Sequence, residues 1–307
     1  MFSFLPEGNL IDTEENRLCI SSPEKLREAM IRGKILEAKA LVCDRAHNLH
    51  LKLGGMKAVI PREEGAVGIK EGTVRDIAVI SRVNRPVCFV VTDITSDENG
   101  EALAVLSREK AQKMCINNYI DTLIPGDIID AKVSRLENFG VFADIGCGIA
   151  ALMPIDTISV SRIVHPRERF TVGMDIKAVI KSIENGRISL SHKELLGTWA
   201  ENAGRFSPGE TVTGTVRSVE NYGSFVELAP NLAGLAEPYP GIEEGMKVSV
   251  YIKSIIPKKM KIKLIVIDTF RDEPVPKQPR YFINAEHIDR FIYSPEGSMR
   301  LVETRFV

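Results

Sequence analysis

The sequence predicts a mostly β protein made of three tandem five-stranded barrels of the OB-fold class, joined by short helical linkers. Two observations predict this fold. The same order of short alternating strands occurs three times along the 307 residues, and helical patterns fall between the copies. The apolar share of 44% and charged share of 26% are ordinary for a folded chain, so we expect most of it to be ordered.

The second strand of each repeat is the clearest of these elements. Its copies begin at His47, Phe139 and Tyr222, with the sequences HNLHLKLGG, FGVFADIGC and YGSFVELAP. Each runs with period two toward a turn that contains Gly or Pro, and each follows another alternating strand: ILEAKALVC, DIIDAKVSR and ETVTGTVRS. Two strands of this kind in succession indicate a β-hairpin at the start of every repeat.

Three further elements complete each repeat. A short apolar segment ends at Pro61, Pro154 and Glu237; a strand led by Gly starts at Glu71, Val172 and Glu244; and a closing strand ends at Ser107, Ser191 and Val266. Five short strands with an interruption between the third and the fourth are typical of a small, partly open barrel.

The repeats predict domain boundaries and three helices. We expect barrels at 34–108, 121–197 and 207–268, linkers at 109–120 and 198–206, an N-terminal segment at 1–33 and a tail at 269–307. One helix starts at a cap near Ser21 and stops at Gly33, one follows Ser107, and one begins near Ser191 with Glu194 completing a capping box. The tail ends in an aromatic stretch that we expect to pack onto a barrel.

The second repeat, from about Asp121 to Gly197, resembles the RNA-binding domain named after bacterial ribosomal protein S-one. The matching positions are Gly126-Asp127, Phe139 to Phe142, Asp144 to Gly146, Val172-Gly173 and Arg187 to Ser191. The third repeat matches at Tyr222 to Phe225 but has a shorter middle section and lacks the RISLS ending. The first matches in outline only, with His47 and His50 where the family has aromatics. As a whole the chain resembles a short, multi-repeat relative of that ribosomal protein.

The aromatic pairs around the central glycines are the candidate RNA-binding residues. Residues i and i+3 of a strand face opposite ways unless the strand bends, and Gly140 and Gly223 permit that bend. Exposed rings stack unpaired bases for about 1–3 kcal/mol each, whatever the sequence. The predicted RNA-binding residues are Phe139, Phe142, Arg187, Tyr222, Phe225, Lys132 and Lys261. The resemblance also implies a histidine after the third strand, but Pro154 stands there.

Simpler structural roles remain open for these residues. A Phe in a strand is usually core, and Arg187 and the lysines at 258, 259, 261 and 263 could be solvated charges on hairpins. His47 and His50 fit solvent-facing strand positions better than metal ligands, because no third ligand is spaced to join them. Trp199 fits a core position on the linker.

Composition and motifs exclude several other classes. The 40 basic and 41 acidic residues give a net charge of −1, which argues against coating duplex nucleic acid by charge alone. The five cysteines lack paired spacing, so we expect reduced, mostly buried thiols and neither disulfides nor a metal site. Catalytic motifs, a cofactor-binding loop, a signal peptide and a membrane-spanning run are not evident, which predicts a cytoplasmic protein that is not an enzyme and needs no cofactor.

The sequence therefore predicts a protein that binds single-stranded RNA, in particular mRNA, and acts in translation at or near the small ribosomal subunit. The second and third barrels would hold the RNA, and the first would be a structural or protein-contact module. Two alternatives stay open: a protein-interaction adaptor, and an accessory factor in transcription or RNA decay.

Overall fold

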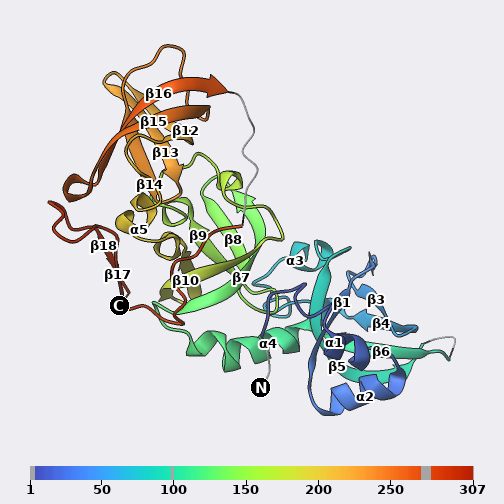
Figure 1. The fold of residues 1–307 in the computed structure, drawn as a ribbon. Coiled ribbons are helices and arrows are strands. Elements are labelled where there is room, and N and C mark those ends of the chain that lie inside the picture. The colour runs from blue at the N-terminus through green and yellow to red at the C-terminus, as the bar shows by residue number, and fades with distance from the viewer. Residues whose placement is uncertain (1–3, 98–99, 271–277, 307) are drawn as a thin grey trace. The chain divides into compact units, whose positions relative to one another are not determined.

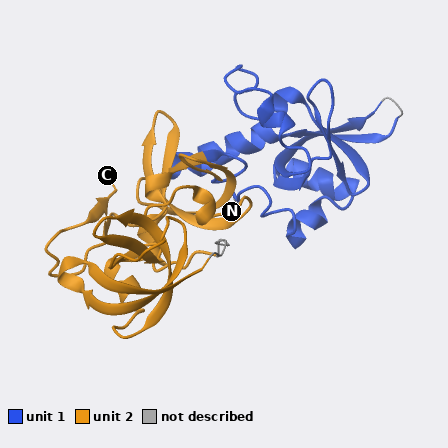
Figure 2. Ribbon diagram, turned by 90° about the horizontal axis from the view of Figure 1, so that it is seen from above, with its two compact units in different colours: residues 1–123, 144–150 blue, residues 124–143, 151–307 orange. Residues whose placement is uncertain are grey.

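The computed structural model describes residues 4–97, 100–270 and 278–306, and its contacts divide the chain into two compact units (Figures 1 and 2). The first unit comprises residues 1–123 and 144–150, and the second comprises residues 124–143 and 151–307. The fold is mostly β, as predicted.

The first unit is a β-sheet with helices at both ends of its sequence. Helices α1 (Glu14–Cys19) and α2 (Pro23–Ile31) precede the sheet, the short helix α3 (Ile77–Ile80) interrupts it, and α4 (Arg108–Asn118) follows it. The strands are β1 (Ile35–Lys39), β2 (Val42–Cys43), β3 (Leu49–Leu53), β4 (Met56–Ile60), β5 (Pro86–Ser96) and β6 (Ala102–Ser107). They form a six-stranded sheet in the order β1-β5-β6-β4-β3-β2.

This sheet has six strands because the first strand of the repeat is broken at Ala40. The Ala40 N–H donates to the Arg85 carbonyl, whereas the Leu41 N–H donates to the His50 carbonyl. The chain therefore changes partner between two adjacent residues, and β1 and β2 lie at opposite ends of the strand order. The Ala40 side chain is fully buried at this break.

The strand predicted from Glu71 in the first repeat is wrong. Residues Ile77–Ile80 form helix α3, which buries the side chain of its own Val79. The fourth strand of the repeat is instead β5, which starts at Pro86. The N–H groups of Thr73 and Val74 both donate to the Gly68 carbonyl, so a turn occupies the start of the predicted strand. The continuous apolar run VCFVV, buried over its whole length, makes the better strand.

The second unit contains two closed five-stranded barrels. The second barrel consists of β7 (Ile128–Glu137), β8 (Gly140–Asp144), β9 (Ala150–Pro154), β10 (Asp175–Glu184) and β11 (Arg187–Ser191). The third consists of β12 (Thr211–Glu220), β13 (Gly223–Ala229), β14 (Leu232–Ala236), β15 (Lys247–Ile256) and β16 (Lys261–Phe270). The strand orders are β10-β11-β9-β8-β7 and β12-β13-β14-β16-β15.

The helical linkers follow local capping rules. Ser22 caps α2, one residue after the predicted position, and Ser107 caps α4 as predicted. The helix expected from Ser191 is split: Lys193–Leu196 is a 3-10 turn, Gly197 has φ +85, and α5 (Trp199–Ala203) starts at a capping box between Thr198 and Glu201. A residue with positive φ cannot continue a right-handed helix, so the predicted start is wrong.

The C-terminal segment packs onto the second unit, as expected from its aromatic composition. Phe291 and Tyr293 are buried in the core of the third barrel beside Trp199, while Phe306 packs with Val179 and Leu195. Two short strands, β17 (Arg290–Ile292) and β18 (Glu303–Arg305), pair within this segment. All five cysteines are free thiols, and Cys88, Cys115 and Cys147 are buried.

Candidate nucleic-acid interface

Two aromatic rings meet on the β7–β8 hairpin of the second barrel. Phe139 lies in the two-residue turn and is 56% exposed, and Phe142 is half-buried on β8. Their ring centroids are 6.1 Å apart and their planes stand at 89°, an edge-to-face contact. The i and i+3 rings therefore lie on one face, which leaves much of the Phe139 ring open to solvent.

Gly140 brings these two rings together because its backbone passes close to the neighbouring strand. A Cβ at Gly140 would lie 2.3 Å from the Met153 carbonyl oxygen, well inside contact distance. Any other residue would push β8 away from β9, where Met153 is fully buried. The glycine thus permits a tight crossing between the rings.

Arg135 completes the aromatic site of the second barrel. Its guanidinium carbon lies 4.6 Å from the centroid of the Phe142 ring, within cation–π range, and its Nε lies 3.0 Å from the Glu137 carboxylate. Arg135 is exposed. Arg135 lies outside the sequence motif, but the third barrel pairs Ser218 with Phe225, and the same spacing places Arg135 opposite Phe142.

The third barrel repeats this geometry. The Tyr222 and Phe225 rings are 6.5 Å apart at an interplanar angle of 90°, and the two residues are 63% and 37% exposed. A Cβ at Gly223 would lie 2.1 Å from the Ala236 carbonyl oxygen. Ser218 pairs directly with Phe225, so a serine occupies the position that Arg135 holds in the second barrel.

The first repeat has no such aromatic pair, and its histidines are held by carboxylates. His50 Nε2 lies 2.9 Å from the Asp44 carboxylate, and His47 Nδ1 lies 3.3 Å from that of Asp76. The hydrogen bond from His50 is the first of several that lower the pKa of Asp44 below its ordinary range. These contacts favour the solvent-facing reading of both histidines.

The sheet positions next to His50 are also apolar or acidic. His50 pairs with Val42 on one side and Val59 on the other, Val59 pairs with Val105, and Val105 pairs with Asp93. The row through His50 therefore carries no Phe, Tyr or Trp ring and no Lys or Arg.

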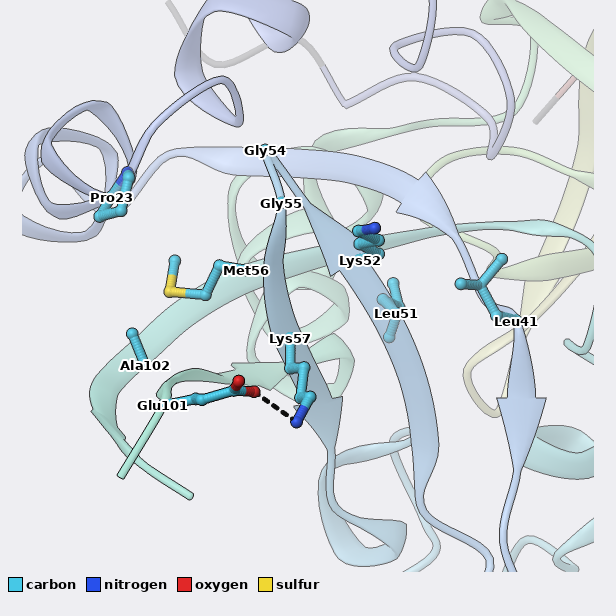
Figure 3. Close-up of a pocket in the computed structure, with 10 residues that line it drawn as sticks. All are labelled: Pro23, Leu41, Leu51, Lys52, Gly54, Gly55, Met56, Lys57, Glu101 and Ala102. Atoms are coloured by element: carbon cyan, nitrogen blue, oxygen red, sulfur yellow. Dashed lines mark ion pairs between the residues drawn. The ribbon is translucent and has the colours of Figure 1, made fainter. Parts of the chain in front are cut away.

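A pocket of about 680 Å³ opens beside the β3–β4 turn of the first unit (Figure 3). Leu41, Met56 and Pro23 form part of its wall, and Lys57 lies at its side. The Lys57 ammonium is 2.6 Å from the Glu101 carboxylate and 3.0 Å from that of Asp97, so its charge is neutralised. Lys52, which is exposed, also lines the pocket.

The three basic residues predicted to bind RNA have different surroundings. Lys132 is half-buried, and its ammonium lies 3.3 Å from the Asp175 carboxylate on β10. Arg187 is exposed at the start of β11, opposite Glu184, and Lys261 is exposed at the start of β16, opposite Ile256. Their contacts with RNA stay predictions.

Within the described parts of the chain, no group of three or more His, Cys, Asp or Glu side chains is arranged to hold a metal ion. The helices of those parts are also too short or too polar for any of them to cross a membrane.

Comparison with known proteins identifies a family for the second barrel. Residues 122–193 match the family model of the S1 RNA binding domain. The small ribosomal subunit protein bS1 of Staphylococcus epidermidis is 38% identical over 172 residues, covering 52% of this chain and 44% of that protein. The bS1 protein of Staphylococcus aureus is 34% identical over 191 residues, covering 56% and 49%.

A third relative covers more of both chains. The small ribosomal subunit protein bS1 homolog of Bacillus subtilis is 30% identical over 264 residues, which are 75% of this chain and 68% of that protein. The chain spans about half the length of the two staphylococcal relatives.

Proposed function

This chain belongs to the bS1 family of small ribosomal subunit proteins, and from that premise we propose that it binds single-stranded RNA through the aromatic pairs of its second and third barrels. The single observation that carries the proposal is the recurrence of one geometry. Phe139 with Phe142, and Tyr222 with Phe225, meet edge to face around a glycine with no room for a side chain.

The exposed rings suit unpaired bases better than a duplex. A stacked base contributes about 1–3 kcal/mol whatever its identity, which favours binding with little sequence preference. The net charge of −1 gives no strong basic surface for a duplex backbone, so the affinity should depend on stacking and be moderate.

Two weak sites on one chain strengthen each other when they engage the same RNA. Contacts within the second unit join the two barrels: the Arg169 guanidinium lies 2.6 Å from the Glu227 carboxylate, which also accepts the Arg217 Nε–H at 2.7 Å. All three side chains are largely buried. This linkage supports a model in which one RNA strand engages both aromatic pairs.

The cellular role we propose is to hold mRNA in translation, at or near the small ribosomal subunit, in the cytoplasm and without catalysis. The family membership supports the ribosomal setting, and the absence of an aromatic pair from the first repeat supports a structural or protein-contact role for that repeat. Co-sedimentation with small ribosomal subunits tests this setting. Co-purification with RNA polymerase or with nucleases instead would favour a role in transcription or RNA decay.

Alanine substitution of the aromatic pairs tests the RNA grip directly. We expect F139A/F142A and Y222A/F225A to weaken binding of a fluorescent oligouridylate at least tenfold each, because each removes two stacking rings at about 1–3 kcal/mol per base. The control is H47A/H50A, which changes the matching pair in the first repeat and should leave affinity unchanged. Unchanged affinity in both aromatic variants, with wild-type circular dichroism, would refute the proposed function.

A further inference from the structure

The outer face of the third barrel carries one continuous row of side chains across five strands. Phe225 on β13 pairs with Ser218 on β12 and with Leu235 on β14, Leu235 pairs with Lys263 on β16, and Lys263 pairs with Ser254 on β15. Lys263 thus lies two strand spacings, roughly 10 Å, from Phe225. The row places a cation beyond the stacking ring on the β16 side.

The second barrel has the same row with its cation on the other side. Leu152 on β9 pairs with Ser189 on β11, and Ser189 pairs with Ser182 on β10, so Ser189 holds the position of Lys263. The cation of this row is Arg135 on β7, over Phe142; its Nε lies 3.0 Å from the Glu137 carboxylate, and the guanidinium carries four further N–H donors. The third barrel therefore has Ser218 on one side of the ring and Lys263 on the other, whereas the second barrel has Arg135 and Ser189 in these two positions.

Lys263 is available for an anion. Its side chain is exposed, and within the described residues it forms no ion pair or hydrogen bond. Two other outward lysines differ in this respect: Lys132 is beside the Asp175 carboxylate at 3.3 Å, and Lys253 lies 3.0 Å from that of Glu237. A free ammonium two strands away from a stacking ring is a point charge suited to a phosphate group.

We propose that Lys263 contacts RNA phosphate in the third barrel and that Arg135 does so in the second, so that the two barrels hold the RNA backbone on opposite flanks of their stacking rings. This assignment rests on the proposed single-stranded RNA binding. It places a cation of the third barrel in the row of Phe225, two residues beyond Lys261 at the hairpin end opposite Ile256.

The arrangement also divides the roles of the two phenylalanines in the second barrel. The Arg135 guanidinium covers the Phe142 ring, whereas Phe139 is the more exposed of the pair. Phe142 therefore positions the cation as well as offering a ring, and Phe139 offers the more open ring to a base.

Salt dependence of binding separates phosphate contacts from stacking. The logarithm of the affinity for a single strand falls with the logarithm of the salt concentration by about 0.7 for each phosphate contact. For the full chain and an oligouridylate long enough to engage both aromatic pairs, we expect K263S and R135S each to lower this slope by about 0.7. The control K253S changes an exposed lysine of the same barrel that is already paired with the Glu237 carboxylate, and it should keep the wild-type slope.

A relocation variant tests whether the two flanks are equivalent. S218R in the K263S background copies the arrangement of the second barrel and should restore the slope that K263S loses. A double variant no better than K263S overturns the equivalence of the flanks. If K263S keeps the wild-type slope, or K253S loses as much, while Y222A/F225A still weakens binding, the assignment of Lys263 is overturned and RNA binding by the barrels stands. If Y222A/F225A and F139A/F142A both leave affinity unchanged, the proposed function itself fails.

Discussion

Gly140 lies directly against the carbonyl group of Met153, and this contact between β8 and β9 determines how the aromatic pair is built. The strand carrying Phe139 and Phe142 can approach its neighbour only because no Cβ stands between them. The same relationship between Gly223 and Ala236 in the third barrel shows that the glycine of the motif serves close packing of the backbone as well as the bend between the rings.

Gly140→Ala should therefore reduce both stability and RNA affinity. The new methyl group would lie 2.3 Å from the Met153 oxygen, so the backbone must move, at a cost of about 3 kcal/mol. The movement would also separate the rings. Gly186→Ala is the control, because Gly186 has φ +72 with open space around it and should cost about 1–2 kcal/mol without affecting RNA. Urea unfolding followed by Trp199 fluorescence measures the stability, and RNA titration measures the affinity. A wild-type RNA affinity in Gly140→Ala would contradict the packing explanation.

The aromatic pairs could be predicted from sequence because repetition of FGVF and YGSF in two copies reveals the motif without any knowledge of pairing. Lys263 and Arg135 could not be identified from the sequence as the cations beside the rings. Their places depend on cross-strand register, which shifts at a β-bulge between Ile252 and Ser254 in the third barrel. One misplaced residue turns a side chain to the other face of the sheet.

The first repeat shows a different limit of sequence patterns. The segment from Glu71 has a glycine followed by apolar residues, as the fourth strands of the other repeats do. A short apolar run, however, fits a helix as well as a strand. Tertiary contacts decide between them: Val79 is buried from a helix, and β5 takes the place beside β1. The break at Ala40 was equally invisible, because ILEAKALVC alternates without any sign of a change of partner.

Arg108→Met should strongly destabilise the first unit. The Arg108 Nε–H donates to the Glu7 carboxylate at 2.6 Å, and both side chains are buried. Burial would raise the pKa of Glu7, but the charges of Arg108 and Arg82 outweigh it and lower that pKa. Removing one partner of such a pair costs about 3–5 kcal/mol.

The chain offers separate probes for its two units. All five cysteines belong to the first unit and the single Trp belongs to the second. Urea-dependent labelling of buried Cys88 and Cys115 therefore measures the effect of Arg108→Met, while Trp199 fluorescence should stay close to wild type. Lys25→Ala is the control, since its exposed pair with Glu28 is worth at most about 1 kcal/mol. Equal stability of the two variants would show that the buried pair contributes little.

Glu37 should make the first unit less stable as the pH rises toward neutrality. Burial raises the pKa of Glu37 from 4.5 to about 7, even though its carboxylate accepts the N–H groups of Gly8, Leu10 and Ile11. Because the folded pKa exceeds the unfolded value, this contribution is fully present below about pH 4.5 and is lost as the pH rises through about 7. The shift corresponds to about 3 kcal/mol.

Glu37→Gln isolates this contribution, because the amide does not titrate. Its single oxygen cannot replace both carboxylate oxygens, so we expect a pH-independent loss of about 1–3 kcal/mol. Urea unfolding is measured at pH values between 4.5 and 7.5, with thiol labelling carried out under the same conditions in every sample. The free energy of unfolding of the wild type should approach that of the variant as the pH rises. Parallel pH profiles for the two proteins would mean that Glu37 is ionised throughout.

Asn231→Ala should uncouple the second and third barrels. The fully buried Asn231 amide lies at the β13–β14 turn; its Oδ1 accepts the Val160 N–H at 3.0 Å, and its Nδ2 donates to the carbonyls of Lys193 and Gly197 at 2.7 and 2.9 Å. Alanine would leave three buried backbone groups without this partner, at about 1–3 kcal/mol each. We expect the calorimetric transition of the second unit to split or broaden. The affinity for a short oligouridylate, which occupies one aromatic pair, should stay at the wild-type value.

The decisive readout for Asn231 is the gain in affinity from a short to a long oligouridylate. That gain depends on the effective concentration of the second site, which falls when the barrels are no longer held together. Asn231→Ala should therefore reduce the gain, and Asn231→Asp should do the same, because a carboxylate cannot donate to the Lys193 and Gly197 carbonyls. Exposed Asn284 supplies the matched control N284A. A wild-type gain in Asn231→Ala would mean that the RNA engages the two barrels independently, with the chain connection alone setting their effective concentration.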